Sequence, residues 1–262
     1  MKLGNISTLI LTHNESPNIG RTLSRLTWSR DIVVVDSFSS DDTLEIVGRY
    51  SNARAFRREF DDHARQWNFG LGQTSIATEW VLALDADYIL TEEFRRELEA
   101  LEPAADVAGY RVRFRYCIEG RPLKAAVYTP VTVLYRRSCA EYVQDGHTQR
   151  VRLSGRVLDL ESPILHDDRK SLRHWLNAQS RYMRLEAEHL RRQRFSGLPV
   201  QDKVRRFIVI APAAMFLYCM FVKGNILDGR RGLFYALQRT VAESILSLYL
   251  LQALLSPDRS AK

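Results

Sequence analysis

Apolar and polar positions alternate along the first hundred residues in blocks that predict strands and helices in turn. The short, mainly apolar runs that predict strands lie at residues 6–11, 32–35, 53–56 and 80–84. The intervening stretches that predict helices lie at residues 19–26, 43–50 and 61–75. We expect Ser16 to be the N-cap of the first helix and Pro17 to be its first residue.

Each strand and the following helix together take roughly 25–30 residues, which is typical of right-handed parallel βαβ units. In open sheets of this kind the ligand lies beyond the carboxyl ends of the strands. No Gly-x-Gly-x-x-Gly or Walker sequence follows a strand, which disfavours a dinucleotide-binding enzyme and a P-loop ATPase.

The pattern changes after residue 107. Residues 109–116 and 129–135 alternate with period two, which indicates antiparallel strands with one solvated face. From residue 171 a long helical pattern begins, and apolar stretches follow at 207–222 and 233–255. We therefore expect an α/β domain over residues 1–168 and a basic, apolar helical region over residues 169–262.

The first apolar stretch has sixteen uncharged residues and contains Pro212. As a helix it would span about 24 Å, short of the ~30 Å hydrocarbon core of a bilayer. We expect the two stretches to lie at a membrane interface, to be re-entrant or to form an oligomer contact. A spanning hairpin and an ordinary helical core are the alternatives. Arg239 and Glu243 are four residues apart and can pair on one face.

Charge is distributed unevenly. The whole chain carries a net charge of +7, while residues 169–206 alone contain eleven Lys or Arg and three Asp or Glu. Such a block favours an anionic partner, although a solvated helix face is the alternative. No nucleic-acid-binding motif accompanies it, so we expect no nucleic-acid partner. The three scattered cysteines argue against a disulfide framework or a zinc site.

Polar residues follow three of the predicted strands. Thr12, Asn14 and Glu15 follow the first and Asp36 ends the second, while Asp85 and Asp87 end the strand at 80–84. Two carboxylates one residue apart suit a Mg²⁺ or Mn²⁺ ion shared with substrate phosphates. An acidic turn before a helix is the alternative for that pair, but the convergence on one sheet edge favours a binding site.

Three other residues could take part in chemistry. Asp145 and His147 flank Gly146 in a polar stretch that predicts a tight turn. His147 could serve as a base or a metal ligand. His166 ends a short apolar run, and we interpret it as a structural residue, with a role as a ligand as the alternative.

The order and spacing of these motifs resemble family 2 glycosyltransferases of the GT-A fold. The similar segments are residues 6–15, 32–43, 64–70 and 85–87, with looser similarity at 146–147, 165–166 and 228–229. The chain looks most like the WaaE-like lipopolysaccharide-core β-glycosyltransferase branch. That branch often has Glu where this chain has Tyr88.

The resemblance implies a role for each site residue. Thr12, Asn14, Glu15 and Asp36 would contact the nucleotide, and Asp85 would contact its ribose. Asp87, with Asp85, would hold the divalent metal. The family's general base lies in the antiparallel part, where Asp145 is the candidate and His147 the alternative.

The resemblance implies an inverting, metal-dependent transfer from a nucleotide sugar, with UDP-hexose expected, to a glycan or glycolipid such as lipopolysaccharide core. A polyprenyl-phosphate acceptor is one alternative, and a non-catalytic module that binds nucleotide sugar or anionic lipid is another. The expected location is the cytoplasmic face of the bacterial inner membrane. There the C-terminal helices would contact the anionic surface, insert into the bilayer or join two copies of the chain.

Overall fold

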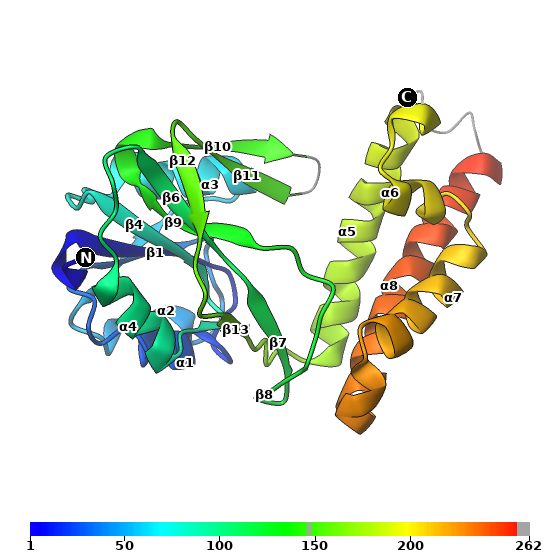
Figure 1. Cartoon of the computed structure of the whole chain (residues 1–262), viewed down its shortest axis with the longest axis horizontal. Coiled ribbons are helices and arrows are strands. Elements are labelled where there is room, and N and C mark those ends of the chain that lie inside the picture. Colours follow the sequence, from blue (N-terminus) through cyan, green and yellow to red (C-terminus); the bar gives the residue numbers. More distant parts are fainter. Residues whose placement is uncertain (146–147, 256–262) are drawn as a thin grey trace. The chain divides into compact units, whose positions relative to one another are not determined.

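The computed structural model describes residues 1–145 and 148–255 (Figure 1). The chain divides into two compact units. We call Met1–Pro122 with Tyr128–Lys170 the α/β unit, and Leu123–Val127 with the chain from Ser171 onward the helical unit. Each unit is described by itself.

A seven-stranded mixed sheet forms the centre of the α/β unit. In spatial order its strands are β12 (Arg156–Asp159), β6 (Val107–Val112), β9 (Val131–Arg136), β4 (Trp80–Asp85), β1 (Ile6–Thr12), β2 (Ile32–Asp36) and β3 (Ala53–Arg57). Strands β1 to β4 run parallel, as predicted, while β9 is antiparallel to β4 and β6. The mixed α/β sheet predicted from the sequence is therefore confirmed.

Helices cover both faces of this sheet (Figure 1). One face carries α1 (Ile19–Leu23), α2 (Thr43–Gly48) and α4 (Glu92–Ala100), and the other carries α3 (His63–Gln73). Alternate strand residues divide between the two cores: Ile6 and Ile10 lie in the same core as Phe94, whereas Leu9 lies in that of Trp67. Because strand side chains alternate in direction, an unbroken apolar run supplies both cores at once.

The predicted strand at 109–116 is in fact two strands, β6 and β7 (Phe114–Ile118), which belong to different sheets. The second sheet has the order β5 (Tyr88–Ile89), β13 (Ile164–His166), β7 and β8 (Arg121–Pro122). A separate antiparallel pair consists of β10 (Ala140–Asp145) and β11 (Thr148–Leu153). The second sheet places His166 directly opposite Tyr88.

The first helix begins later than predicted. α1 starts at Ile19 with Asn18 before it, so Ser16 is not its cap and Pro17 is not its first residue. The amide of Ser16 donates instead to Asp41 Oδ2 at 3.1 Å, and the carbonyl of Glu15 accepts from Asn18 and Ile19. These bonds hold residues 15–18 in a turn that precedes the helix.

We expect the substitution Gly109→Ala in β6 to lower the free energy of unfolding by about 1–3 kcal/mol, because a methyl group there overpacks the sheet. An added Cβ would lie 2.9 Å from the carbonyl oxygen of Leu134 and 2.5 Å from Leu153 Cδ1. Gly48→Ala is the control, because no heavy atom lies within 4 Å of its added Cβ. Urea denaturation followed by circular dichroism measures both. Equal stability of the two variants would contradict the prediction.

The helical unit contains one long helix packed between two others. α8 (Gly229–Leu255) contacts α5 (Leu172–Arg192) and α7 (Ile210–Leu217). The shorter segments are η3 (Phe195–Gly197), α6 (Val200–Arg205), a π-helical segment (Tyr218–Val222) and η5 (Asn225–Asp228). Within the described ranges, no single helix is long and apolar enough to cross a membrane. The bent pair Ile210–Val222 and Asn225–Leu255, at 71°, meets the length and composition requirements only jointly.

The predicted pairing of Arg239 with Glu243 is replaced by a different one. Glu243 is 1% exposed and accepts from Arg205 Nη2 at 2.8 Å and Nε at 3.1 Å. Arg205 also donates to Glu186 at 3.0 Å. The partner of Glu243 is therefore Arg205 of α6. The spacing of residues along α8 alone could not indicate this pairing.

Candidate active site

The carboxyl ends of three neighbouring strands converge on one edge of the central sheet. Thr12 lies opposite Asp36, and Leu11 lies opposite Asp85. This register follows from the parallel arrangement of β2, β1 and β4. It brings together polar residues that are up to 73 positions apart along the chain, from Thr12 to Asp85.

Asp36 organises the loops at this edge. Its side chain is fully buried and accepts hydrogen bonds from Thr12 Oγ1 at 3.0 Å, from the Ser39 amide at 2.9 Å and from Ser39 Oγ at 2.5 Å. The Asn14 amide donates to Ser39 Oγ at 2.8 Å, and Asn14 Oδ1 accepts from the Ser40 amide at 2.8 Å. Thr12, Asn14 and Asp36 therefore fix the shape of the two loops that border the site.

Asp85 and Asp87 have different surroundings. Asp85 keeps some exposure to solvent, but the protein atoms around it displace much of its hydration. This desolvation, followed by the neighbouring charge of Asp87, raises the pKa of Asp85 to about 6. Burial also opposes ionisation of Asp87, but the attraction of His166 and Lys170 outweighs it, so the pKa of Asp87 lies below its usual value. Of the two acids, Asp87 is the one that stays ionised as the pH falls, because Asp85 takes up a proton first.

His166 holds Asp87 in place. His166 Nε2 lies 3.0 Å from Asp87 Oδ2, and both side chains are about 15% exposed. The rings of Tyr88, Tyr116 and Tyr128 surround the imidazole edge-on, with centroids 5.3, 5.0 and 5.3 Å away. Burial lowers the pKa of His166, but the Asp87 carboxylate more than offsets this and raises it above the usual value. His166 therefore differs from the structural residue expected from the sequence, because it contacts the site directly.

Tyr88 occupies the position after the Asp-x-Asp pair. Burial and the charges of Asp85 and Asp87 raise the pKa of its phenol well above the usual value, so the hydroxyl stays neutral. Its hydrogen bond to Asp85 lowers the pKa of that carboxyl. A neutral donor in this position adds no negative charge to the acidic edge.

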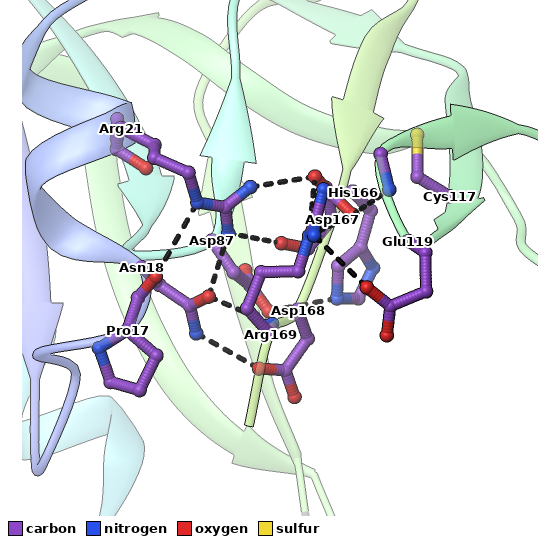
Figure 2. Close-up of polar contacts among 12 residues, drawn as sticks. Pro17, Asn18, Arg21, Asp87, Cys117, Glu119, His166, Asp167, Asp168 and Arg169 are labelled. Carbon is purple, nitrogen blue, oxygen red and sulfur yellow. Dashed lines mark hydrogen bonds and ion pairs between the residues drawn. The ribbon is translucent and has the colours of Figure 1, made fainter. Parts of the chain in front are cut away.

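The segment after His166 is fixed by an ion-pair cluster around Asp167 (Figure 2). Arg21 Nη1 lies 2.6 Å from Asp167 Oδ2, and Arg169 Nε lies 3.0 Å from Asp167 Oδ1. Asn18, which is fully buried, accepts from Arg21 Nη2 and from the Arg169 amide, both at 2.8 Å. Asp167 is 5% exposed, so these contacts hold residues 167–169 firmly against α1.

Lys170 places a cation beside the acids at this sheet edge. It forms an ion pair with Glu15, and its amide donates to Asp168 Oδ1 at 3.0 Å. Burial, together with the charge of Asp87, raises the pKa of Glu15 to about 7 against the opposing effect of Lys170 and Asn18. Burial lowers the pKa of Lys170, but Glu15, Asp168 and Asp87 outweigh it and raise the value. Lys170 thus offsets part of the negative charge at this edge.

One oxygen of Asp87 is suited to bind a divalent cation. Its Oδ2 is occupied by His166, whereas Oδ1 is buried and has no hydrogen-bond partner among the described residues. Within residues 1–145 and 148–255, no group of three or more His, Cys, Asp or Glu forms a ready-made metal site. That fits Mg²⁺ or Mn²⁺, which commonly take one or two carboxylates and complete their shell with substrate phosphates and water. Asp87 and Asp85 are the residues that would hold the ion.

The predicted site residues thus fall into two groups. Thr12, Asn14, Glu15, Asp36, Asp85 and Asp87 come together at one sheet edge. His147 lies outside the described residues, and so does the side chain of Asp145, whose backbone ends β10. The functions assigned to both remain predictions. The sequence interpretation missed Asn18, Arg21, Asp167 and Lys170. For Asp167 and Lys170 the one signal was a charged run directly after a short apolar strand, and no such run marks Asn18 or Arg21.

Comparison with known proteins assigns the chain to a class. Residues 7–143, about half of the chain, match the family described as Glycosyl transferase family 2. The protein therefore belongs to family 2 of the glycosyltransferases, a class of enzymes that transfer sugars from nucleotide sugars. The matched region includes β1 to β4 and both carboxylates of the Asp-x-Asp pair.

Relatives with this similarity come from several bacteria. One is an uncharacterised glycosyltransferase of Rickettsia prowazekii, 25% identical over 72% of this chain and 68% of that protein. Another is the lipopolysaccharide core biosynthesis glycosyltransferase LpsC of Rhizobium meliloti, 33% identical over 51% of this chain and 48% of that protein.

A solved structure confirms the GT-A fold. It is a mannosyltransferase from Pyrobaculum calidifontis in complex with GDP-Man and Mn²⁺, with a TM-score of 0.54 and 15% identity. The match covers 98% of this chain and 88% of that one. At this identity the likeness concerns the fold alone.

Proposed function

We propose that this protein transfers a hexose from a UDP-sugar, with inversion at the anomeric carbon, to a hydroxyl group of a cell-envelope glycan or glycolipid such as lipopolysaccharide core. The observation that carries the reaction type is the Asp87 carboxylate just beyond the end of β4. His166 fixes one of its oxygens, and the other has no hydrogen-bond partner among the described residues. The similarity to LpsC supports the acceptor class.

The described residues would contact the nucleoside and, through a cation, the pyrophosphate of the donor. The loops fixed by Thr12, Asn14 and Asp36 border the site on the side of β1 and β2, where a base and ribose would bind. A divalent cation bound at Asp87 and Asp85 would neutralise the charge that develops on the departing pyrophosphate. His166 keeps the Asp87 carboxylate oriented and ionised for that task.

The acceptor must lose a proton as it attacks. A carboxylate on the opposite side of the sugar would accept this proton, and a single displacement of this kind inverts the anomeric carbon. Asp145 is the proposed base and His147 the alternative. Asp145 is the last residue of β10, and His147 lies outside the described residues.

A thermal-shift screen with nucleotides and nucleotide sugars tests the donor assignment. A ligand present at about 100 times its dissociation constant stabilises the native state by about 2.7 kcal/mol. We expect UDP and at least one UDP-sugar to raise the melting temperature in the presence of Mn²⁺, and adenine nucleotides to leave it unchanged. If GDP-sugars alone raised the melting temperature, the donor nucleotide would be GDP and the assignment of UDP would be wrong. No stabilisation by any nucleotide sugar would contradict the proposal.

A further inference from the structure

The outward faces of α7 and α8 are apolar. Among the described residues, 24 large hydrophobic side chains are exposed, and 20 of these belong to the helical unit. Ile210, Leu217 and Phe221 follow one another at helical spacing and are 60%, 54% and 62% exposed. On α8, Leu237 and Leu248 are 48% and 66% exposed. Each helix thus presents an apolar stripe to its surroundings.

The buried face of α8 mixes apolar residues with small and polar ones. Its buried residues are Gly232, Tyr235, Ala236, Ala242, Glu243, Leu246, Ser247 and Leu250, and Ala242, Leu246 and Leu250 belong to a hydrophobic core with α5. Ser247 Oγ donates to the carbonyl of Ile208 at 2.7 Å and to that of Glu243 at 2.8 Å. A surface helix of a water-soluble domain carries polar residues on its outward face, whereas α8 has apolar residues on both its buried and its exposed sides. The arrangement suits a helix whose outer side contacts hydrocarbon, where polar groups must be satisfied internally.

Positive charge accompanies this surface. The helical unit, counted to residue 255, contains fourteen Lys or Arg and five Asp or Glu. Lys223 lies at the bend between the two apolar helices, and Arg230 and Arg231 begin α8. Anionic lipid headgroups attract such residues when they lie next to an inserted apolar face.

We propose that the helical unit docks on an anionic phospholipid bilayer through an apolar surface, and that it inserts into one leaflet. The apolar surface consists of Val209, Ile210, Leu217, Phe221, Val222, Ile226, Leu227 and Leu237. The 71° bend and the cations beside it place the charged groups at headgroup level while the apolar stripes enter the acyl boundary.

A second copy of this chain is the competing occupant of the surface. Pairing two such units would bring together two regions of the same positive charge, which opposes association. An anionic bilayer has the opposite charge and needs no complementary shape. The charge distribution therefore favours the bilayer. Docking of the helical unit on a membrane is a property separate from the proposed function, because it does not depend on sugar transfer.

Flotation of the purified full chain with vesicles tests the proposal. We expect the parent to float with phosphatidylcholine vesicles that contain phosphatidylglycerol, and more weakly with phosphatidylcholine alone. Val209→Gln/Phe221→Gln should reduce the bound fraction at least about tenfold, because two side chains lose their burial in lipid. These residues are 87% and 62% exposed, so the changes should not disturb folding. Lys223→Gln/Arg230→Gln should remove most of the preference for anionic vesicles.

The matched control changes two exposed apolar residues of the α/β unit. Phe60→Gln/Val131→Gln alters side chains that are 46% and 43% exposed and should float like the parent. Thermal melts verify folding of each variant. Three results would overturn the proposal: a parent that does not float, equal flotation of Val209→Gln/Phe221→Gln, or a vesicle-free dimer of the parent that this variant converts to monomer. Nucleotide release measured without vesicles reports separately on the proposed function.

Discussion

The substitution Asp87→Asn is expected to slow release of nucleoside diphosphate from the donor by about 100-fold or more. Removing one group that stabilises charge on a leaving group commonly costs that much. The amide keeps the shape of the side chain but has no charge for a cation at Oδ1 or for His166. Steady-state rates at saturating Mn²⁺ measure the effect. A rate within tenfold of the parent would contradict the assigned role.

Asp159→Asn is the matched control for that experiment. Asp159 forms an exposed ion pair with Arg111, with the oxygen and nitrogen 2.8 Å apart, and belongs to β12 at the edge of the same sheet. We expect its rate to equal that of the parent. Thermal melts of both variants show whether the loss in Asp87→Asn reflects chemistry or unfolding.

The substitution Arg21→Ala is expected to lower the free energy of unfolding by about 2–3 kcal/mol, because it removes a cation from a buried carboxylate. The side chain of Asp167 is 7% exposed and, within the described part of the chain, would retain Arg169 and the Gly120 amide as its partners. Loosening this segment should also lower the transfer rate, since residues 166–170 supply His166 and Lys170. Urea denaturation and nucleotide release measure the two effects.

Arg49→Ala provides the comparison. Arg49 pairs with Glu45 at 2.7 Å, but both side chains are about two-thirds exposed. Exposed pairs of this kind contribute about 0–1 kcal/mol. If Arg21→Ala and Arg49→Ala had the same small effect, the cluster around Asp167 would be an ordinary surface feature and not a support of the site.

Local sequence patterns were sufficient to predict the parallel strands β1 to β4 and the acidic edge where they end. The apolar runs that form β1, β2 and β4 are nearly fully buried. A strand that is buried on both faces has a continuous run of apolar residues, which can be recognised from the local sequence alone. The positions of Asp36, Asp85 and Asp87 then follow from where those runs end. The family motifs add to this, because they lie at the same strand ends.

The other half of the site depends on contacts that no local pattern encodes. His166 reaches Asp87 from 79 residues away, and Asp168 reaches Asn18 from 150 residues away. These contacts exist because β13 pairs with β5, two short strands with little periodic signal. A contact between distant residues also explains where α1 starts. The Ser16 amide donates to Asp41, which lies in a different loop, and this bond keeps Ser16 out of the helix.

The release of nucleoside diphosphate by the unaltered protein tests the central claim most directly. The protein is incubated with a panel of UDP- and GDP-sugars and an extract of bacterial envelope, with Mn²⁺ in one series and EDTA in the other. We predict release from at least one donor that requires the extract, is lost in EDTA and accompanies incorporation of labelled sugar into the glycolipid fraction. No release from any donor, or equal release in EDTA, would contradict the account.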